Sequence, residues 1–234
     1  MRASLAAGLS LCLSIAYAPA IGAQGGVPPN LTIAFIGDQG LRADSRAVLA
    51  LVRDRADAVF HQGDFDYSDN PQAWEDQINQ ILGPNFPYFA SVGNHDISRF
   101  YGSGGYQEVL EARMNRLGIP WVGDLGAQSS FYYEGIFVVL VAPGVAGNGD
   151  GFHDTYIRER LAADDSIWRV VSWHKNMRAM QLGSKSDETG WGECTRSRGA
   201  VALSSPPATS TRTPAPTSSA ASRARRSRAS TQPP

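Results

Sequence analysis

Four short apolar segments of this sequence are each followed by a side chain that can bind a metal ion. These side chains are Asp38, Asp64, Asn94 and His174. Because ligands of α/β proteins bind beyond the carboxyl ends of the strands, we expect the four to converge at one sheet edge. Carboxylate and amide oxygens with an imidazole nitrogen are ligands for metals such as Zn, Mn and Fe. One Gly-Asp after a strand is a common turn, whereas the ordered series predicts a metal site.

Such a site suits the hydrolysis of phosphate esters. One carboxylate can bridge two ions, and two ions about 3.5–4 Å apart activate a water molecule and clamp the phosphoryl oxygens. The leaving group also needs a proton donor, and His95 is well placed for this beside Asn94. Asp96 is expected to orient or polarise the imidazole of His95. The residues therefore predict a dinuclear centre in which His95 and Asp96 are catalytic.

The segments that position these residues alternate between strands and helices. Apolar, β-rich runs predict strands over 31–36, 58–60, 88–92 and 168–173, with a hairpin formed by 130–133 and 136–142. Apolar residues at helical spacing predict helices over 45–55, 71–82, 106–117 and 155–163. The alternation predicts an α/β fold with a largely buried sheet.

The composition predicts one globular domain between two dissimilar ends. The 234 residues carry a net charge of −1, with 42% hydrophobic residues and two cysteines. These values argue against a collagen, a coiled coil, a multi-span membrane protein or a disulfide scaffold. Residues 193–234 carry seven arginines and one acidic residue, so the rest of the sequence has a charge of −7.

The first 23 residues have the pattern of a secretory signal peptide. A basic start precedes an apolar run that ends in small residues, at Ala20 or Ala23. A membrane anchor is the alternative, but the run is short for a span of about 20 residues. We therefore expect a secreted or periplasmic protein without a stable membrane anchor. Cys12 would leave with the signal, so that Cys194 remains alone and no intramolecular disulfide forms.

The motifs resemble four of the five metal-site blocks of the calcineurin-like metallophosphoesterases. These blocks are Gly37-Asp38-Gln-Gly40, Gly63-Asp64-Phe-Asp-Tyr67, Gly93-Asn94-His95-Asp96 and Val171-Ser-Trp-His174. The Gly-Asp-x-x-Tyr spacing, and Gly rather than His at position 40, are most similar to the purple acid phosphatase branch. The resemblance covers about residues 31–192 and implies a layered β-sandwich flanked by helices, incomplete at its C-terminal end.

The resemblance also implies a role for each matching residue. Asp38 and Tyr67 would bind one metal ion, Asp64 would bridge, and the other ion would be bound by Asn94 and His174. Asn94 and His95 would contact the phosphate of a small phosphorylated substrate, and Lys175 is a weaker candidate for that role. Tyr67 as a phenolate ligand suits Fe(III), paired with Zn, Mn or Fe; a tyrosine that does not coordinate favours Mn, Zn or Mg. Whether monoesters or diesters are cleaved stays open, as does the oligomeric state.

The fifth block of the family, Gly-His-x-His, is missing, because no histidine follows His174. After Gly192 the sequence becomes rich in Ser, Thr, Ala, Pro and Arg, which indicates a shifted reading frame. Codons that encode Ser204 to Thr217 can be regrouped by one base to give Val-Ala-Thr-Gly-His-Glu-His-Ser-Tyr-Ser-Arg-Thr-His. That reading contains the missing block. Nucleotide sequencing across codons 185–220 would reveal such a shift.

These features predict a partial phosphoesterase domain over 25–192 and a low-complexity, disordered tail over 193–234. We expect the strand that carries the missing block to be lost and the hydrolysis of phosphomonoesters to be weak. The alternative is a non-catalytic domain that binds metal or phosphate and carries a basic arm. If the tail is a frameshift product, its arginines give no reason to expect nucleic-acid binding. Of the remaining histidines, we expect His61 to be structural and His153 to lie on the surface.

Overall fold

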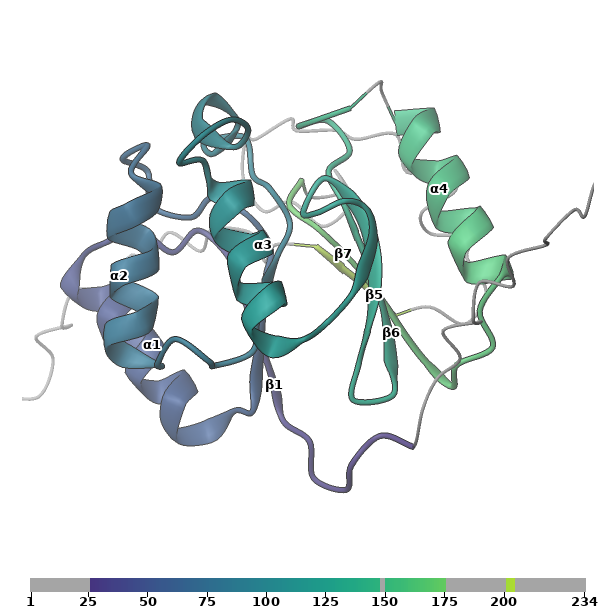
Figure 1. Ribbon diagram of the computed structural model, residues 1–234, viewed down its shortest axis with the longest axis horizontal. Coiled ribbons are helices and arrows are strands. Elements are labelled where there is room, and N and C mark those ends of the chain that lie inside the picture. The colour runs from purple at the N-terminus through teal and green to yellow at the C-terminus, as the bar shows by residue number, and fades with distance from the viewer. Residues whose placement is uncertain (1–25, 148–149, 176–200, 205–234) are drawn as a thin grey trace, which may run out of the picture.

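Two β-sheets lie against each other, and helices cover their outer faces (Figure 1). The computed structural model describes residues 26–147, 150–175 and 201–204. The elements are β1 (Ile33–Ile36), α1 (Ala43–Arg55), β2 (Ala58–His61), α2 (Pro71–Ile81), β3 (Tyr88–Ala90), the 3₁₀ turn η1 (Ile97–Arg99), α3 (Tyr106–Leu117), β4 (Trp121–Asp124), β5 (Gln128–Tyr133), β6 (Ile136–Val141), α4 (Asp150–Ala162), β7 (Trp168–Trp173) and β8 (Val201–Ser204). The predicted α/β class and its layered arrangement are confirmed.

The first sheet is entirely parallel, in the order β1-β2-β3. Helix α1 connects β1 to β2 and helix α2 connects β2 to β3, so each connection is a βαβ unit. Helix α2 begins at Pro71, and the side chain of Asn70 accepts a hydrogen bond from the backbone N–H of Ala73. Because the three strands run parallel, all of them end at the same edge of the sheet.

The second sheet has the order β4-β5-β6-β7-β8. Its first three strands are antiparallel, whereas β6, β7 and β8 run parallel. The predicted hairpin is present: Tyr133 pairs with Ile136 across Glu134 and Gly135, which both have positive φ. A two-residue turn of this kind matches the twist of the strands.

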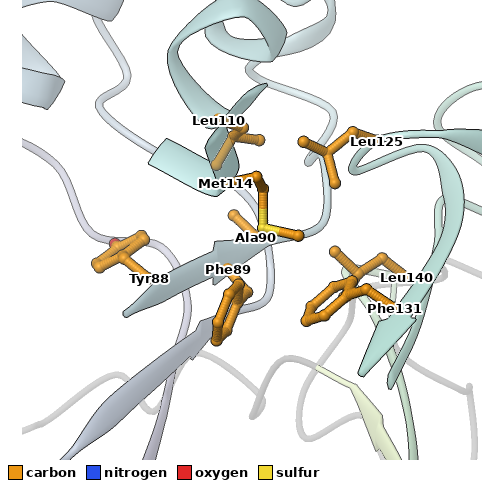
Figure 2. Close-up of a pocket in the computed structure, with 8 residues that line it drawn as sticks. All are labelled: Tyr88, Phe89, Ala90, Leu110, Met114, Leu125, Phe131 and Leu140. Carbon is orange, nitrogen blue, oxygen red and sulfur yellow. The ribbon is translucent and has the colours of Figure 1, made fainter. Parts of the chain in front are cut away.

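The main core lies between the two sheets, and a second apolar cluster lies beneath α4. Strand β6 serves both, because its residues alternate between the main core (Ile136, Val138, Leu140) and the cluster under α4 (Phe137, Val139, Val141). Figure 2 shows where α3 and β3 meet the second sheet, at a crevice too narrow for a water molecule and lined by residues including Met114 and Leu140. Tight packing here fixes the first sheet against the second.

Two predictions about secondary structure and one about the exposure of His153 need correction. Strand β4 was not predicted, because only its first two residues, Trp121 and Val122, have the β-rich character of the other strands. Helix α4 begins at Asp150 rather than at 155. His153 lies on this helix and is fully buried, with its Nε2 atom 2.6 Å from the carbonyl of Ala146, so the expected surface position is wrong.

A short strand lies within the C-terminal segment. β8 pairs with β7 in parallel, from Val170 opposite Val201 to Trp173 opposite Ser204. It does not contain the Gly-His-x-His block, and the disorder expected over 193–234 stays a prediction. The predicted signal peptide (1–23) and the rest of the tail lie outside the described residues. Within the described part, no helix is long and apolar enough to span a membrane.

Candidate metal centre

The loops that follow β1 and β2 continue the pairing of their strands beyond the sheet. The backbone N–H of Asp38 donates to the carbonyl of Gly63 at 3.0 Å, and that of Gln39 donates to the carbonyl of Asp64 at 2.9 Å. Gly40 donates in the same way to Phe65. This short ladder places Asp38 beside Asp64, as the strand order predicts.

Two glycines allow the loops after β2 and β3 to touch. A Cβ atom on Gly93 would lie 2.2 Å from the backbone nitrogen of Asp64 and 2.3 Å from its Oδ1 atom. A Cβ atom on Gly63 would lie 2.7 Å from the Cα atom of Gly93 and 2.9 Å from the Cβ atom of His174. Glycine is therefore required at both positions for the predicted ligands to come together.

Asp64, Asn94 and His174 form the centre of the site. The Nδ1 atom of His174 lies 2.7 Å from the carbonyl oxygen of Gln62. Because a carbonyl only accepts hydrogen bonds, Nδ1 carries the proton, and in the neutral ring Nε2 presents its lone pair. That Nε2 atom lies 3.2 Å from Asn94 Oδ1 and 3.3 Å from Asp64 Oδ1.

These separations fit the coordination sphere of one metal ion. Ligand atoms about 2.0–2.2 Å from an ion lie roughly 2.8–3.1 Å from each other in octahedral geometry and roughly 3.3–3.6 Å in tetrahedral geometry. His174 and Asp64 are also nearly buried, at 8% and 3% exposure. A lone pair that faces a carboxylate oxygen at 3.3 Å, away from bulk water, is stabilised when a cation lies between them. The donor set therefore fits a divalent or trivalent metal.

Asp38 and Tyr67 form a second pair of oxygen ligands beside Asp64. The hydroxyl of Tyr67 donates to Asp38 Oδ1 at 2.6 Å. Burial and the adjacent carboxylates of Asp38 and Asp64 raise the pKa of Tyr67, so without a cation its hydroxyl stays protonated. The structure thus brings all five predicted metal ligands to one edge, in the two groups that the resemblance implies.

The backbone at three of these ligands is in the left-handed region. Asp38, Asp64 and Tyr67 have φ values of +52°, +58° and +55°. Non-glycine residues seldom adopt this conformation, and it is concentrated where a function fixes the position of a side chain. The strained loops are held in place by other groups, of which Asp96 is the main one.

The role predicted for Asp96 needs correction. Its carboxylate accepts hydrogen bonds from the backbone N–H groups of Asp64, Phe65 and Gly93, at 2.7–2.9 Å, rather than from the imidazole of His95. Asp96 is fully buried, and this burial raises its pKa to about 7, while the bonds from Phe65 and Gly93 act in the opposite direction. Asp96 therefore positions the two ligand loops against each other.

His95 and Lys175 flank the site on its open side. The imidazole of His95 packs against the ring of Tyr67, with 4.9 Å between ring centroids, and its backbone N–H donates to Asp64 Oδ1. The side chain of His95 is exposed, as a residue that meets a substrate must be. Lys175 follows His174 and is half-buried, and its carbonyl accepts a hydrogen bond from the indole of Trp173. Its contact with substrate stays a prediction.

His61 lies beneath the metal centre and is fully buried among aromatic rings, as expected of a structural residue. Its ring centroid is 5.1 Å from that of Phe65 and 5.8 Å from that of Tyr88. Burial, and then the nearby charge of His174, lower the pKa of His61 to about 3. His61 is therefore neutral in the fold near neutral pH.

Taken alone, this buried histidine makes the fold less stable in mild acid. The unfolded state takes up a proton below a pH of about 6.5 and folded His61 does not, so the contribution of His61 to the free energy of unfolding falls by about 1.4 kcal/mol per pH unit. The raised pKa of Asp96 acts in the opposite direction, because the folded state takes up that proton first as the pH falls below about 7. Urea unfolding at pH 7 and pH 5 therefore compares the wild type with His61→Asn, which keeps a donor near Nδ1: the change on acidification should be about 2 kcal/mol more favourable in the variant. Equal changes in both proteins would show that His61 makes no such contribution.

The site contains few of the most common metal ligands. Among the described residues, no group of three or more His, Cys, Asp or Glu side chains gathers at one point. The centre combines Asp64 and His174 with the amide of Asn94 instead. Strand β8 ends at Ser204, opposite Trp173 and therefore beside His174. Histidines placed just after Ser204 would lie at the edge where further ligands are needed.

A two-sheet α/β fold that brings Asp, Asn and His side chains together at its strand ends suits metal-dependent hydrolysis of phosphate esters. A family model described as calcineurin-like phosphoesterase matches residues 31–200, and the chain belongs to this family. Among solved structures, it is similar to the purple acid phosphatase PPD1 isolated from yellow lupin (Lupinus luteus) seeds, at 20% identity and a TM-score of 0.44. That match covers 66% of this chain and 31% of the lupin chain. No curated protein matches the sequence.

Proposed function

We propose that this protein is a phosphoric ester hydrolase of the acid phosphatase type, acting on small phosphomonoesters with two metal ions. The observation that carries the proposal is the convergence of His174 Nε2 with the Oδ1 atoms of Asn94 and Asp64, at 3.2–3.3 Å. A signal peptide over residues 1–23 would direct it to the periplasm or outside the cell.

The proposed ligands divide into two sets around Asp64. Asn94 and His174 would hold one ion with it, and Asp38 and Tyr67 would hold the other. When bound, the ions would supply Lewis acidity toward the phosphoryl oxygens and toward water. His95 is exposed beside both sets and would donate a proton to the leaving oxygen, while the packing of its ring on Tyr67 limits its movement.

The chemistry of the ligands also bears on the identity of the metals. Tyr67 keeps its proton on the Asp38 carboxylate, and the surroundings raise its pKa. A strongly acidic ion replaces that proton most readily, which favours Fe(III) at the Asp38 and Tyr67 position; Mn(II) would bind there more weakly, with Tyr67 still protonated. Zn, Mn or Fe(II) suits the imidazole, amide and carboxylate of the other set.

A second candidate follows from the sequence after His174, which contains no histidine. Without the Gly-His-x-His block, each proposed ion lacks one ligand and turnover should be weak. The protein would then bind metal or phosphate without efficient catalysis. Measurements of metal content and of p-nitrophenyl phosphate turnover distinguish the two candidates.

Two substitutions test the proposed division of roles. His174→Ala should weaken Mn(II) binding by at least about 100-fold, because it removes a ligand from a site with few others. His95→Ala should leave Mn(II) affinity within about threefold and reduce any phosphatase turnover by about 100-fold, as expected for loss of a general acid. Calorimetric titration and p-nitrophenyl phosphate assays measure the two effects. Mn(II) affinity that is unchanged in His174→Ala would refute the proposed metal centre.

A further inference from the structure

A chain of partly to fully buried hydrogen bonds connects the loop after β1 to the interior of the first sheet. The side-chain Nε2 of Gln39 donates to Gln77 Oε1 on α2 at 2.7 Å. The hydroxyl of Tyr88, the first residue of β3, donates to Gln39 Oε1 at 2.6 Å, and it also lies 2.9 Å from His61 Nδ1. Figure 2 shows that Tyr88 projects away from the side of β3 that meets Phe131.

The orientation of the two glutamine amides sets the direction of every bond in this chain. Because the amide nitrogen of Gln39 is used on Gln77, its oxygen faces Tyr88, and the single hydroxyl proton must lie between them. The Nδ1 atom of His61 must then carry a proton and donate to the Tyr88 oxygen. The low pKa of His61 agrees with this, since the neutral ring leaves Nε2 as a buried acceptor that has no partner among the described residues.

The chain ends next to a proposed metal ligand. Gln39 directly follows Asp38, whose backbone has a φ of +52°. Both the backbone and the side chain of Gln39 form hydrogen bonds. Its backbone N–H donates to the carbonyl of Asp64, and its side chain is held by Tyr88 and Gln77. Asp38 itself is exposed and has little packing of its own to fix its loop.

We propose that Tyr88 and Gln39 are positioning residues that hold Asp38 ready to bind a metal ion. The inference rests on the proposed function. It assigns to Tyr88 and Gln39, which do not bind the metal themselves, the role of orienting a residue that does. Partners that orient metal ligands change metal affinity by about 10–100-fold when they are removed. The effect should be largest on the ion held by Asp38, because Gln39 is bonded next to Asp38 in the sequence, whereas His174 acts on this chain of hydrogen bonds at its other end, through His61.

The test uses Tyr88→Phe, which removes only the hydroxyl and keeps the ring, together with Gln39→Met, which keeps the length of the side chain. Two-step Mn(II) titrations of the full chain would be compared with Asp38→Asn and His174→Ala, which identify the two steps. We expect both variants to weaken the Asp38 step about tenfold and to change the His174 step less. The double variant should be weaker than the single variants by less than the sum of their effects, because the two substitutions share the Tyr88–Gln39 bond.

Hydrogen exchange of residues 37–41 supplies a second measurement that does not depend on metal, and it should be faster in both variants. Tyr132→Phe is the matched control, because it removes a Tyr–carboxylate bond to Asp164 in the second sheet and should change neither step nor the exchange. Wild-type affinity and exchange in both variants would overturn the inference. Absence of Mn(II) binding in the wild type would refute the proposed function, while the exchange rates would still test the positioning role.

Discussion

We expect phosphatase activity to rise at least about 100-fold when the reading frame is restored near Gly192, so that the chain contains Val-Ala-Thr-Gly-His-Glu-His-Ser-Tyr-Ser-Arg-Thr-His. This block supplies one histidine to each proposed ion. Loss of outer-shell partners alone costs about 10–100-fold, so restoring a direct ligand to both ions should have a larger effect.

The position of β8 provides the structural reason. The parallel register of β7 and β8 sets Ser204 opposite Trp173, so the chain leaves β8 beside His174. Metal ligands that follow β8 would lie at the same sheet edge as Asp64 and Asn94. Restoring the frame also replaces Val201–Ser204, so the block reaches this edge when the restored residues form the strand beside β7.

The measurement compares kcat/KM for p-nitrophenyl phosphate, with Mn(II) or Zn(II) added, between the chain as written and the restored chain. The control is the restored chain with both histidines of the block replaced by alanine, which should behave like the chain as written. Equal activity of the written and restored chains would show that the missing block is not part of the site.

The second large effect is expected for Gly93→Ala. The added methyl group would lie 2.2–2.3 Å from the backbone nitrogen and Oδ1 atom of Asp64. The nitrogen donates to Asp96 and Oδ1 accepts from the backbone N–H of His95, so neither can move without disturbing a hydrogen bond. Overpacking usually costs 1–3 kcal/mol, and contact with backbone belongs at the upper end of that range. We expect a loss of about 3 kcal/mol in the free energy of unfolding and a weakening of Mn(II) binding of at least about tenfold.

Gly26→Ala is the matched control for this substitution. Neither Gly26 nor Gly93 has a positive φ, but a Cβ atom on Gly26 would meet nothing within 4 Å. Urea unfolding should therefore find Gly26→Ala within about 0.5 kcal/mol of the wild type. Equal stability of the two alanine variants would contradict the close approach of the loops after β2 and β3.

The strands and the ligands could be predicted because their signals are local. Apolar runs that end in Gly-Asp or Gly-Asn identified β1, β2 and β3, and the order of the blocks indicated that Asp38, Asp64, Asn94, His174 and Tyr67 would converge. The structure brings all five together. Helix α3 has the predicted bounds, Tyr106–Leu117.

The functions of Asp96 and Gln39 depend on contacts between distant segments, which the sequence does not contain. Asp96 stands next to His95, and this adjacency favoured a pair, but its side chain points inward to three backbone N–H groups. Gln39 lies inside the first block, yet its partners are 38 and 49 residues away. Strand β8 lies in a segment whose composition favours disorder, and only its pairing with β7 identifies it.

The most direct test of the proposed metal centre is an anomalous-scattering map from crystals of the full chain grown with Mn(II). We predict a peak about 2.0–2.3 Å from His174 Nε2 and from the Oδ1 atoms of Asp64 and Asn94. A second, weaker peak is expected between Asp38 and Tyr67. A map with no peak at the carboxyl ends of β2, β3 and β7, although Mn(II) is present in the crystal, would contradict the account.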